Sequence, residues 1–304
     1  MKVAVTGATG VLGTAAVRAL TGAGHDVVGL ARTPERADRL AALGATPYRG
    51  DLFDHESLLA MFDGCDAVCN LATHIPVGLA ALRSRAWREN DRLRTEGVRR
   101  VVDAAQEARV RRLVQESVSF LYADGGDGWI AEDSPLDINP ATEPASVGES
   151  HAQGFRSEVR HSVVLRFGTI VGDDGLTRWQ LRTARSGLPV GVGTPAGWTH
   201  LVHTDDLGSA VAAALCAPSG TYNVGAEPTR REDLVAGYAE AAGRRTTFMR
   251  PALQRLAGSR LEPLTRSLRV NSEHFTAQTG WTPRRAHFDP SWFDVVGLEA
   301  HACP

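Results

Sequence analysis

Three glycines near the start of the chain set the strongest limit on its fold. Gly7, Gly10 and Gly13 separate a β-branched run at residues 2–5 from apolar residues at helical spacing over 15–23. Glycines at this spacing allow a tight turn from a strand into a helix and let phosphates approach the backbone amides. Because the triplet lies between a predicted strand and a predicted helix, it predicts a dinucleotide-binding site in a first βαβ unit.

The chain then continues to alternate between buried strands and helices. Further strands are predicted at residues 26–31, just before 49, and at 67–72, 113–117 and 162–167. The intervening helices are predicted at residues 34–43, 55–62 and 86–108. Strands that alternate with helices at this spacing form a parallel sheet covered on both faces. The sequence therefore predicts an α/β protein built on a doubly wound parallel sheet.

Beyond residue 172 the alternation gives way to short apolar segments, prolines and aromatic residues. We predict a dinucleotide-binding domain over residues 1–172 and mainly a smaller substrate-binding lobe over residues 173–304. Residues 201–225 are predicted to return to the first domain.

The end of the second strand bears on the choice between the two nicotinamide dinucleotides. NAD sites usually place a carboxylate there for the ribose hydroxyls, whereas an arginine accommodates the 2′-phosphate of NADP. The strand over 26–31 ends at Arg32 and has no carboxylate at its tip. Arg32 is either a phosphate ligand or a solvated surface charge. We predict NADP(H) as the preferred cofactor, with NAD(H) possible.

Several short motifs occur in the order known from one enzyme family. They are TGATGVLG at 6–13, DL at 51–52, NLA at 70–72, LRFGTIVG at 165–172, VHTDDL at 202–207, YNVG at 222–225 and GWTP at 280–283. Together they resemble the extended short-chain dehydrogenase/reductase family, the NAD-dependent epimerase/dehydratase-like group. The resemblance covers nearly the whole chain and implies a Rossmann-type fold. It implies that the cofactor is bound by Gly7, Thr9, Gly10, Val11, Leu12, Gly13, Arg32, Asp51, Leu52, Leu71, Ala72, Thr73, Phe167, Gly168 and Ile170.

This chain departs from the family at the catalytic Tyr-x-x-x-Lys pair, in which the tyrosine transfers the substrate proton. By helix register the tyrosine position falls on Ala145 or Ser146, and the lysine position on Glu149 or Ser150. The chain has a single lysine, Lys2, so no tyrosine has a lysine four residues later. The family's active serine position is also changed.

Valine occupies that serine position at Val118. The candidates for another proton donor are Ser117, Ser119, Tyr122 and His151, together with water or an acidic hydroxyl on the substrate. Each residue has an ordinary structural reading as well. His151 can be a solvated helix residue, Tyr122 a packing residue, and the serines can orient the substrate or end a strand.

We interpret the chain as an atypical NADPH-dependent ketoreductase acting on a bulky, aromatic polyketide-type ketone, as in the secondary metabolism that makes antibiotics. Trp129, Trp179 and Trp198 suit a flat ligand, although aromatic side chains more often pack in the core. Two alternatives stay open. One is a sugar-nucleotide epimerase or dehydratase, which needs a base; the other is a non-catalytic NADP(H)-binding regulator.

Charge and hydropathy argue against several other classes of partner. The chain carries 33 Lys and Arg against 35 Asp and Glu, and this net charge of −2 gives no basic field for nucleic acid or membranes. No apolar run approaches the roughly 20 residues of a membrane span, and the start does not resemble a signal peptide. The four scattered cysteines predict no metal site. We expect a cytoplasmic monomer or homodimer that binds a small-molecule substrate.

Overall fold

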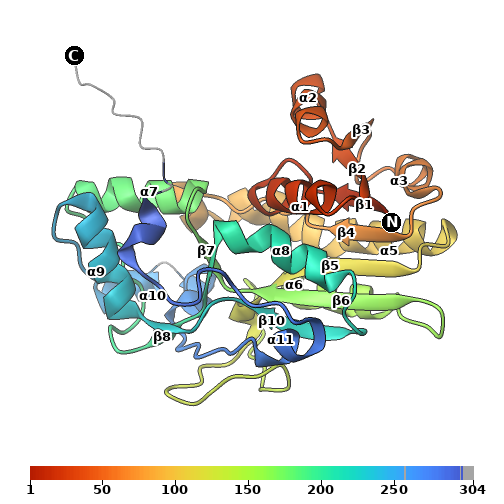
Figure 1. Cartoon of the computed structure of the whole chain (residues 1–304). Helices are drawn as coiled ribbons and strands as arrows, with labels where there is room; N and C mark the ends of the chain where they lie inside the picture. The colour runs from red at the N-terminus through yellow and green to blue at the C-terminus, as the bar shows by residue number, and fades with distance from the viewer. Residues whose placement is uncertain (257, 295, 297–304) are drawn as a thin grey trace.

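The computed structural model describes residues 1–256, 258–294 and 296. Seven strands form one sheet in the order β10-β6-β5-β4-β1-β2-β3, with every neighbouring pair parallel (Figure 1). The strands are β1 (Lys2–Thr6), β2 (Asp26–Ala31), β3 (Thr46–Arg49), β4 (Ala67–Asn70), β5 (Arg112–Val118), β6 (His161–Phe167) and β10 (Gly220–Val224). This is the strand order of a Rossmann sheet, so the predicted α/β fold is confirmed.

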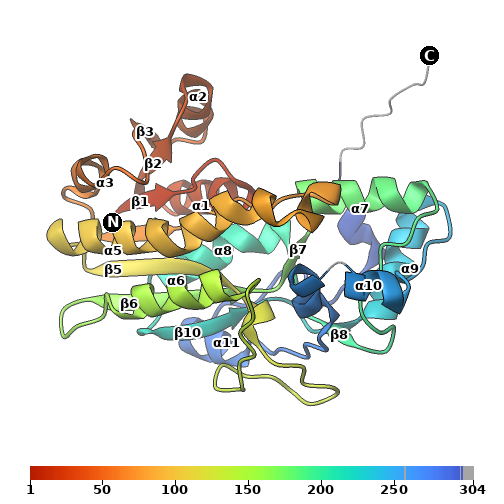
Figure 2. The same cartoon turned by 180° about the vertical axis from the view of Figure 1, so that it is seen from behind.

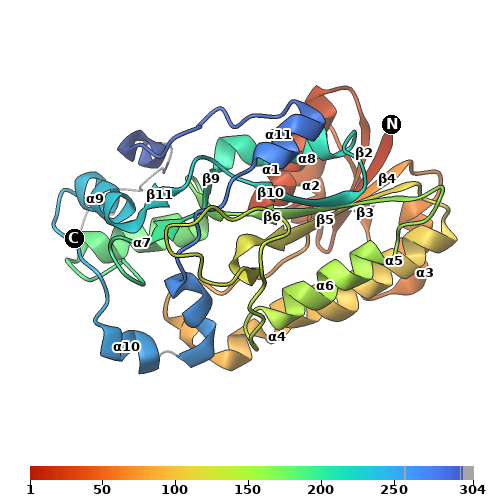
Figure 3. The same cartoon turned by 90° about the horizontal axis from the view of Figure 1, so that it is seen from below.

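Helices cover both faces of the sheet, as the views from behind and from below show (Figures 2 and 3). One face carries α1 (Val11–Gly22), α2 (Pro34–Ala42), α8 (Thr204–Ala214) and α11 (Glu273–Thr279). The other face carries α3 (His55–Phe62), α5 (Val98–Glu107) and α6 (Glu143–Gln153). Because helices bury both faces of the sheet, the strands are continuous apolar runs in the sequence and do not alternate between apolar and polar residues.

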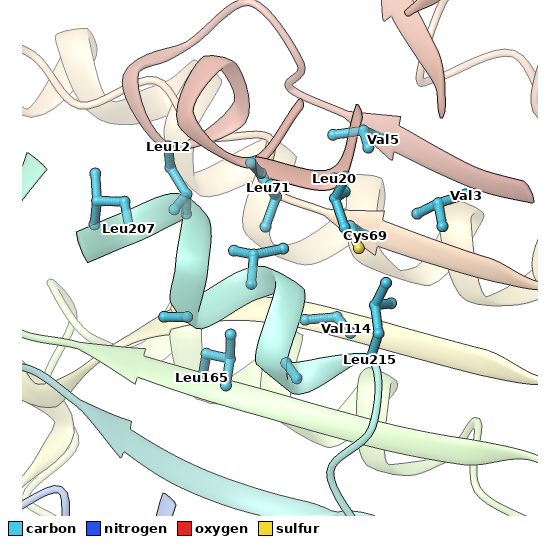
Figure 4. Packing of buried hydrophobic residues seen from close by; sticks show 14 of the residues in the cluster. Val3, Val5, Leu12, Leu20, Cys69, Leu71, Val114, Leu165, Leu207 and Leu215 are labelled. Carbon is cyan, nitrogen blue, oxygen red and sulfur yellow. The ribbon is translucent and has the colours of Figure 1, made fainter. Parts of the chain in front are cut away.

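The core follows from the alternation of side chains along each strand. Val3 and Val5 of β1 point into one cluster with residues of α1 and α8, whereas Ala4 belongs to the cluster under α3 and α5. Figure 4 shows Leu12 and Leu207 meeting in the first cluster. Both clusters exclude water from the sheet, and this holds the carboxyl ends of all the strands at one rigid edge.

The helix predicted over residues 86–108 is interrupted. It consists of α4 (Arg88–Arg92), one π-helical turn (Leu93–Gly97) and α5. The turn lies against α6, where a Cβ at Gly148 would be only 2.6 Å from the carbonyl oxygen of Arg94. π turns often occur at functional sites, and periodicity alone does not distinguish them from an α-helix.

A smaller lobe follows β6. Its two short ladders pair β7 (Thr169–Val171) with β9 (Leu201–His203), and β8 (Trp198–Thr199) with β11 (Thr229–Arg230). Its helices are α7 (Gly175–Arg185), α9 (Arg231–Ala242) and α10 (Pro251–Leu256).

Within residues 201–225, β10 joins the main sheet and α8 covers it, while β9 pairs outside the main sheet. The predicted lobe boundary at residue 304 lies outside the described residues. No described helix combines the length and the apolar character needed to cross a membrane.

Candidate active site

The glycine turn joins β1 to α1 at the carboxyl edge of the sheet. Gly7 has a φ of 65°, and a Cβ there would lie 2.5 Å from the carbonyl oxygen of Leu71. A Cβ at Gly13 would lie 2.1 Å from the carbonyl oxygen of Gly7. A Cβ at Gly10 would approach that same oxygen only to 3.4 Å, and Gly10 starts α1 with no side-chain cap. Two glycines therefore close the turn, and the third leaves the first amides of α1 open to an anion.

This geometry fits the diphosphate of a dinucleotide. The other residues predicted to bind the cofactor lie at or near the same edge, because the strands of the main sheet are parallel. They are Thr9, Val11 and Leu12 in the turn, Arg32 after β2, Asp51 and Leu52 after β3, Leu71, Ala72 and Thr73 after β4, Phe167 and Gly168 at the end of β6, and Ile170 in β7. Which of these side chains touch the cofactor stays a prediction.

Arg32 lies at the tip of β2 with most of its side chain in solvent. Its guanidinium is 3.8 Å from the carboxylate of Glu89, and the two side chains are 57 % and 41 % exposed. Such an exposed pair is weak, so Glu89 does not hold Arg32 away from a ligand. A second arginine, Arg36, follows in the first turn of α2. The edge beside β2 thus presents positive charge where a 2′-phosphate would lie.

Helix α6 shows which residues occupy the family's tyrosine and lysine positions. Its buried side chains include Ala145 and Glu149, whereas Ser146 is partly exposed and Ser150 is exposed. Since the buried side packs on β5 and β6, the register places Ala145 at the tyrosine position and Glu149 at the lysine position. Val118, at the serine position, ends β5 opposite Phe167 of β6.

Glu149 forms a buried ion pair with Arg166 of β6. The carboxylate accepts hydrogen bonds from Arg166 Nε at 2.9 Å and from Arg166 Nη2 at 2.7 Å, and the two side chains are only 6 % and 5 % exposed. Glu149 Oε1 also accepts a hydrogen bond from the Ser117 hydroxyl at 2.6 Å. The side chain that replaces the lysine is therefore neutralised inside the protein.

The remaining proton-donor candidates occupy different surroundings. Tyr122 is fully buried and donates its hydroxyl to Asn223 Oδ1 at 2.7 Å, and burial raises its pKa. Ser119 follows β5 in a 3₁₀ turn, and its buried Oγ has no hydrogen-bond partner among the described residues. His151 lies two residues beyond Glu149 and is partly exposed, on a different side of α6. Ser119 alone of the four combines burial with an unused hydroxyl.

The structure also reveals polar partners that the sequence analysis missed. Arg94 of the π turn donates to Glu116 at 2.8 Å, and both side chains are less than 10 % exposed. Asn70 of β4 donates to Gln115 of β5 at 2.8 Å. Buried polar side chains therefore run across the carboxyl ends of the strands. Their sequence signal is weak, because each pair joins residues far apart in the chain.

The aromatic residues considered for the substrate have mixed surroundings. Trp129 and Trp198 both stack on the guanidinium of Arg269, at 4.1 and 4.6 Å from the ring centres. Trp179 of α7 lies against the backbone at Gly78, where a Cβ would be 2.8 Å from the indole nitrogen. Trp129 and Trp198 therefore lie together around Arg269, whereas Trp179 lies apart from them against Gly78.

Comparison with known proteins identifies the family. A family model described as "NAD dependent epimerase/dehydratase family" matches residues 3–225. The chain belongs to this family. A "3-diazoavenalumate denitrifying reductase" from a Streptomyces species is 32 % identical over 98 % of this chain and 100 % of that protein. A "4-hydroxy-2-methyl-3-oxo-4-farnesyl-3,4-dihydroquinoline-1-oxide ketoreductase" from Stigmatella aurantiaca is 36 % identical over 41 % of this chain and 36 % of that protein.

A solved structure agrees with the fold. Human epimerase family protein SDR39U1 (isoform 2), determined with NADPH, superposes with a TM-score of 0.79 over 97 % of this chain and 99 % of that chain, at 23 % identity. The family and the named reductases make this chain an NAD(P)H-dependent oxidoreductase, as the sequence predicted. It is an atypical family member, because it lacks the Tyr-Lys pair.

Proposed function

We propose that this chain reduces an electrophile that accepts a hydride without taking a proton from the protein, and that an arenediazonium group is the best candidate. The surroundings of the missing pair are the observation that carries the proposal. Ala145 and Val118 put apolar side chains at the positions of the family's tyrosine and active serine. Glu149, at the lysine position, is buried and paired with Arg166.

The atom balance of the two reactions explains why the pair is dispensable. A ketone becomes an alcohol by gaining a hydride at carbon and a proton at oxygen, so a positioned acid speeds the reaction about 10²–10⁴-fold. An arenediazonium ion is already cationic. When bound, the reduced nicotinamide supplies a hydride. The net change is then that the carbon–nitrogen bond breaks, a carbon–hydrogen bond forms and dinitrogen leaves, with no net proton consumed.

The Streptomyces relative supports this reading, because its name joins a diazo substrate to loss of nitrogen and the match extends over its whole length. Arg32 supports NADPH over NADH, since a guanidinium at the tip of β2 can pair with the 2′-phosphate. The protein's own part in the reaction is to bind and orient the two reactants, which can lower a barrier by roughly 7–11 kcal/mol.

Release of nitrogen gas tests the proposal directly. Purified protein is mixed with NADPH and a benzenediazonium salt labelled with nitrogen-15 in both positions, and labelled dinitrogen is followed by mass spectrometry. We expect one dinitrogen and one arene for each NADPH consumed, well above the rate in a protein-free control. We also expect little change in kcat between about pH 6 and pH 8, because no protein acid is used. Dinitrogen release no faster than in the control contradicts the proposal.

A second candidate is the ketoreductase predicted from the sequence, acting on an aromatic polyketide-type ketone. The Stigmatella ketoreductase favours it, and so does the unused hydroxyl of Ser119. In that case the proton comes from Ser119, from water or from an acidic hydroxyl on the substrate. An epimerase is less well supported, because the register leaves Ala145 where that chemistry needs a base.

Two serine substitutions separate these candidates. We expect Ser117→Ala to change kcat by less than about 3-fold and to lower the free energy of unfolding by about 1 kcal/mol, because its hydroxyl is already spent on Glu149. Ser119→Ala is expected to leave nitrogen release unchanged. If the protein instead reduces an aromatic ketone panel and Ser119→Ala slows that reduction about 100-fold, the ketoreductase candidate stands.

A further inference from the structure

A cavity in the smaller lobe lies beside the candidate active site. It has a volume of about 530 Å³ and is lined by Gly193, Thr194, Pro251, Gln254, Gly258, Glu262 and Thr265. The next residue after this lining, Arg266, donates to the carbonyl oxygen of Tyr122 at 3.0 Å. The cavity wall therefore adjoins the loop that follows β5, and its size suits part of a small ligand.

Arg231, at the start of α9, places a buried positive charge without an ion-pair partner in the described part of the chain next to this cavity. Its side chain is buried, with the residue only 6 % exposed, and Nη2 donates to the carbonyl oxygen of Arg266. Nη1 is buried and has no hydrogen-bond partner among the described residues. Burial lowers the pKa of Arg231. A buried charge without a partner is costly, and such costs are typically retained where a ligand supplies the partner.

Two other arginines of the lobe, Arg230 and Arg260, form ion pairs. Arg230 contacts Asp127 at 2.8 Å, and Arg260 contacts Asp91 at 2.7 Å. No ion pair to Arg231 is formed by a carboxylate in the part of the chain that the structure describes. Asp124 lies near enough to act on Arg231 electrostatically, but it forms no ion pair with the guanidinium within the described residues.

Glycines separate Arg231 from the cavity. A Cβ at Gly193 would lie 2.5 Å from Nη1, and a Cβ at Gly197 would lie 2.3 Å from it. Gly193 also lines the cavity, so Nη1 lies directly behind the cavity wall. The segment 186–197 contains Gly187, Gly191, Gly193 and Gly197, which permits the backbone changes that would bring Nη1 to a ligand.

We propose that this cavity receives a carboxylate-bearing arm of the substrate and that Arg231 recognises the carboxylate. The inference rests on the proposed function and names its substrate class, an aromatic acid. A diphosphate fits less well. No described arginine lines the cavity, and the wall itself carries the carboxylate of Glu262. The nearby Arg266 is already held by Glu262 at 2.7 Å and by Asp137 at 3.1 Å.

Calorimetric titration with an unreactive pair of ligands tests the inference in the intact protein. Cinnamate and cinnamamide share a ring and an arm and differ in charge. We expect wild type to bind cinnamate about 10- to 100-fold more tightly than cinnamamide, as for a hydrogen bond to a charged group. Arg231→Met is expected to reduce that ratio to near one without altering the Kd for NADPH.

Arg230→Gln is the matched control, because Arg230 is next in sequence, is partly exposed and already has a carboxylate partner. Arg230→Gln should leave the ratio of the affinities for cinnamate and cinnamamide unchanged. Arg231→Lys keeps the positive charge and provides a second test if Arg231→Met fails to fold. It should preserve part of the preference for cinnamate over cinnamamide. Equal binding of acid and amide by wild type overturns the inference. So does tighter, Arg231-dependent binding of UDP, which would assign the site to a diphosphate.

The outcome is independent of turnover, because cinnamate is not reduced. If no nitrogen is released from a diazonium salt but cinnamate binds through Arg231, the proposed function fails and the carboxylate site stands. If nitrogen is released but cinnamate and cinnamamide bind equally well, the proposed function stands and the carboxylate site fails.

Discussion

Glu149→Lys is expected to lower the free energy of unfolding by about 3–5 kcal/mol, the usual cost of breaking a buried ion pair from one side. The substitution restores the residue type that the family carries at this position. In this chain, however, it removes both hydrogen bonds to Arg166 and places a second positive charge within a site that is about 95 % buried. Urea denaturation followed by circular dichroism measures the change.

Three further variants isolate the pair. Glu149→Gln keeps the shape of the side chain and should destabilise less than Glu149→Lys. Glu96→Gln removes a partly exposed carboxylate of the π turn, which is paired with Arg92 and Arg100. It should lower the free energy of unfolding much less. The double variant Glu149→Lys with Arg166→Glu exchanges the charges and should recover part of the loss. A Glu149→Lys protein as stable as wild type would contradict the role given to Arg166.

Gly10→Ala is expected to weaken NADPH binding about 10- to 100-fold while leaving the fold intact. The backbone there is extended, with φ of −78° and ψ of 177°, and a Cβ would meet only the Gly7 carbonyl oxygen, at 3.4 Å. An alanine therefore fits the folded protein. It fills the space above the first amides of α1, through which a diphosphate must approach.

Gly7→Ala provides the contrast at the same turn. It requires a positive φ of 65° from an alanine and a Cβ 2.5 Å from the carbonyl oxygen of Leu71, so it should lower the melting temperature as well as cofactor affinity. NADPH fluorescence titration and thermal melts on both variants separate the two effects. If Gly10→Ala binds NADPH as wild type does, the turn is not the diphosphate site.

The features predictable from the sequence are those encoded locally. The glycine turn, Arg32 at the strand end and the apolar strands each depend on a few adjacent residues, so the sheet could be predicted. The absence of the Tyr-Lys pair was equally visible, because a single lysine excludes it. The break in the helix over 86–108 was not predicted, because a single π turn of five residues is too short to change the helical pattern of the whole segment.

The partners of the site depend on contacts across the chain. Glu149 and Arg166 meet only because α6 packs over β6 in one register, whereas the residue types along the helix left both Glu149 and Ser150 open for the lysine position. Arg231 gave no signal at all, because an arginine beside another arginine is typical of a solvated surface. Its significance comes from the burial of Nη1 without a hydrogen-bond partner among the described residues, which only the folded chain reveals.

The buried ion pair of Glu149 and Arg166 limits how this site can evolve. A single substitution of Glu149 by the family's lysine is expected to give a poorly folded protein, because it leaves Arg166 buried beside a second positive charge. Changing Arg166 first leaves Glu149 buried without its partner, so both residues must change together. The Arg166 guanidinium also lies over the ring of Tyr122, at 4.9 Å from the ring centre. The pair is therefore expected to persist in proteins that inherit it. Such proteins are expected to differ in substrate rather than to return to the Tyr-Lys chemistry of the family.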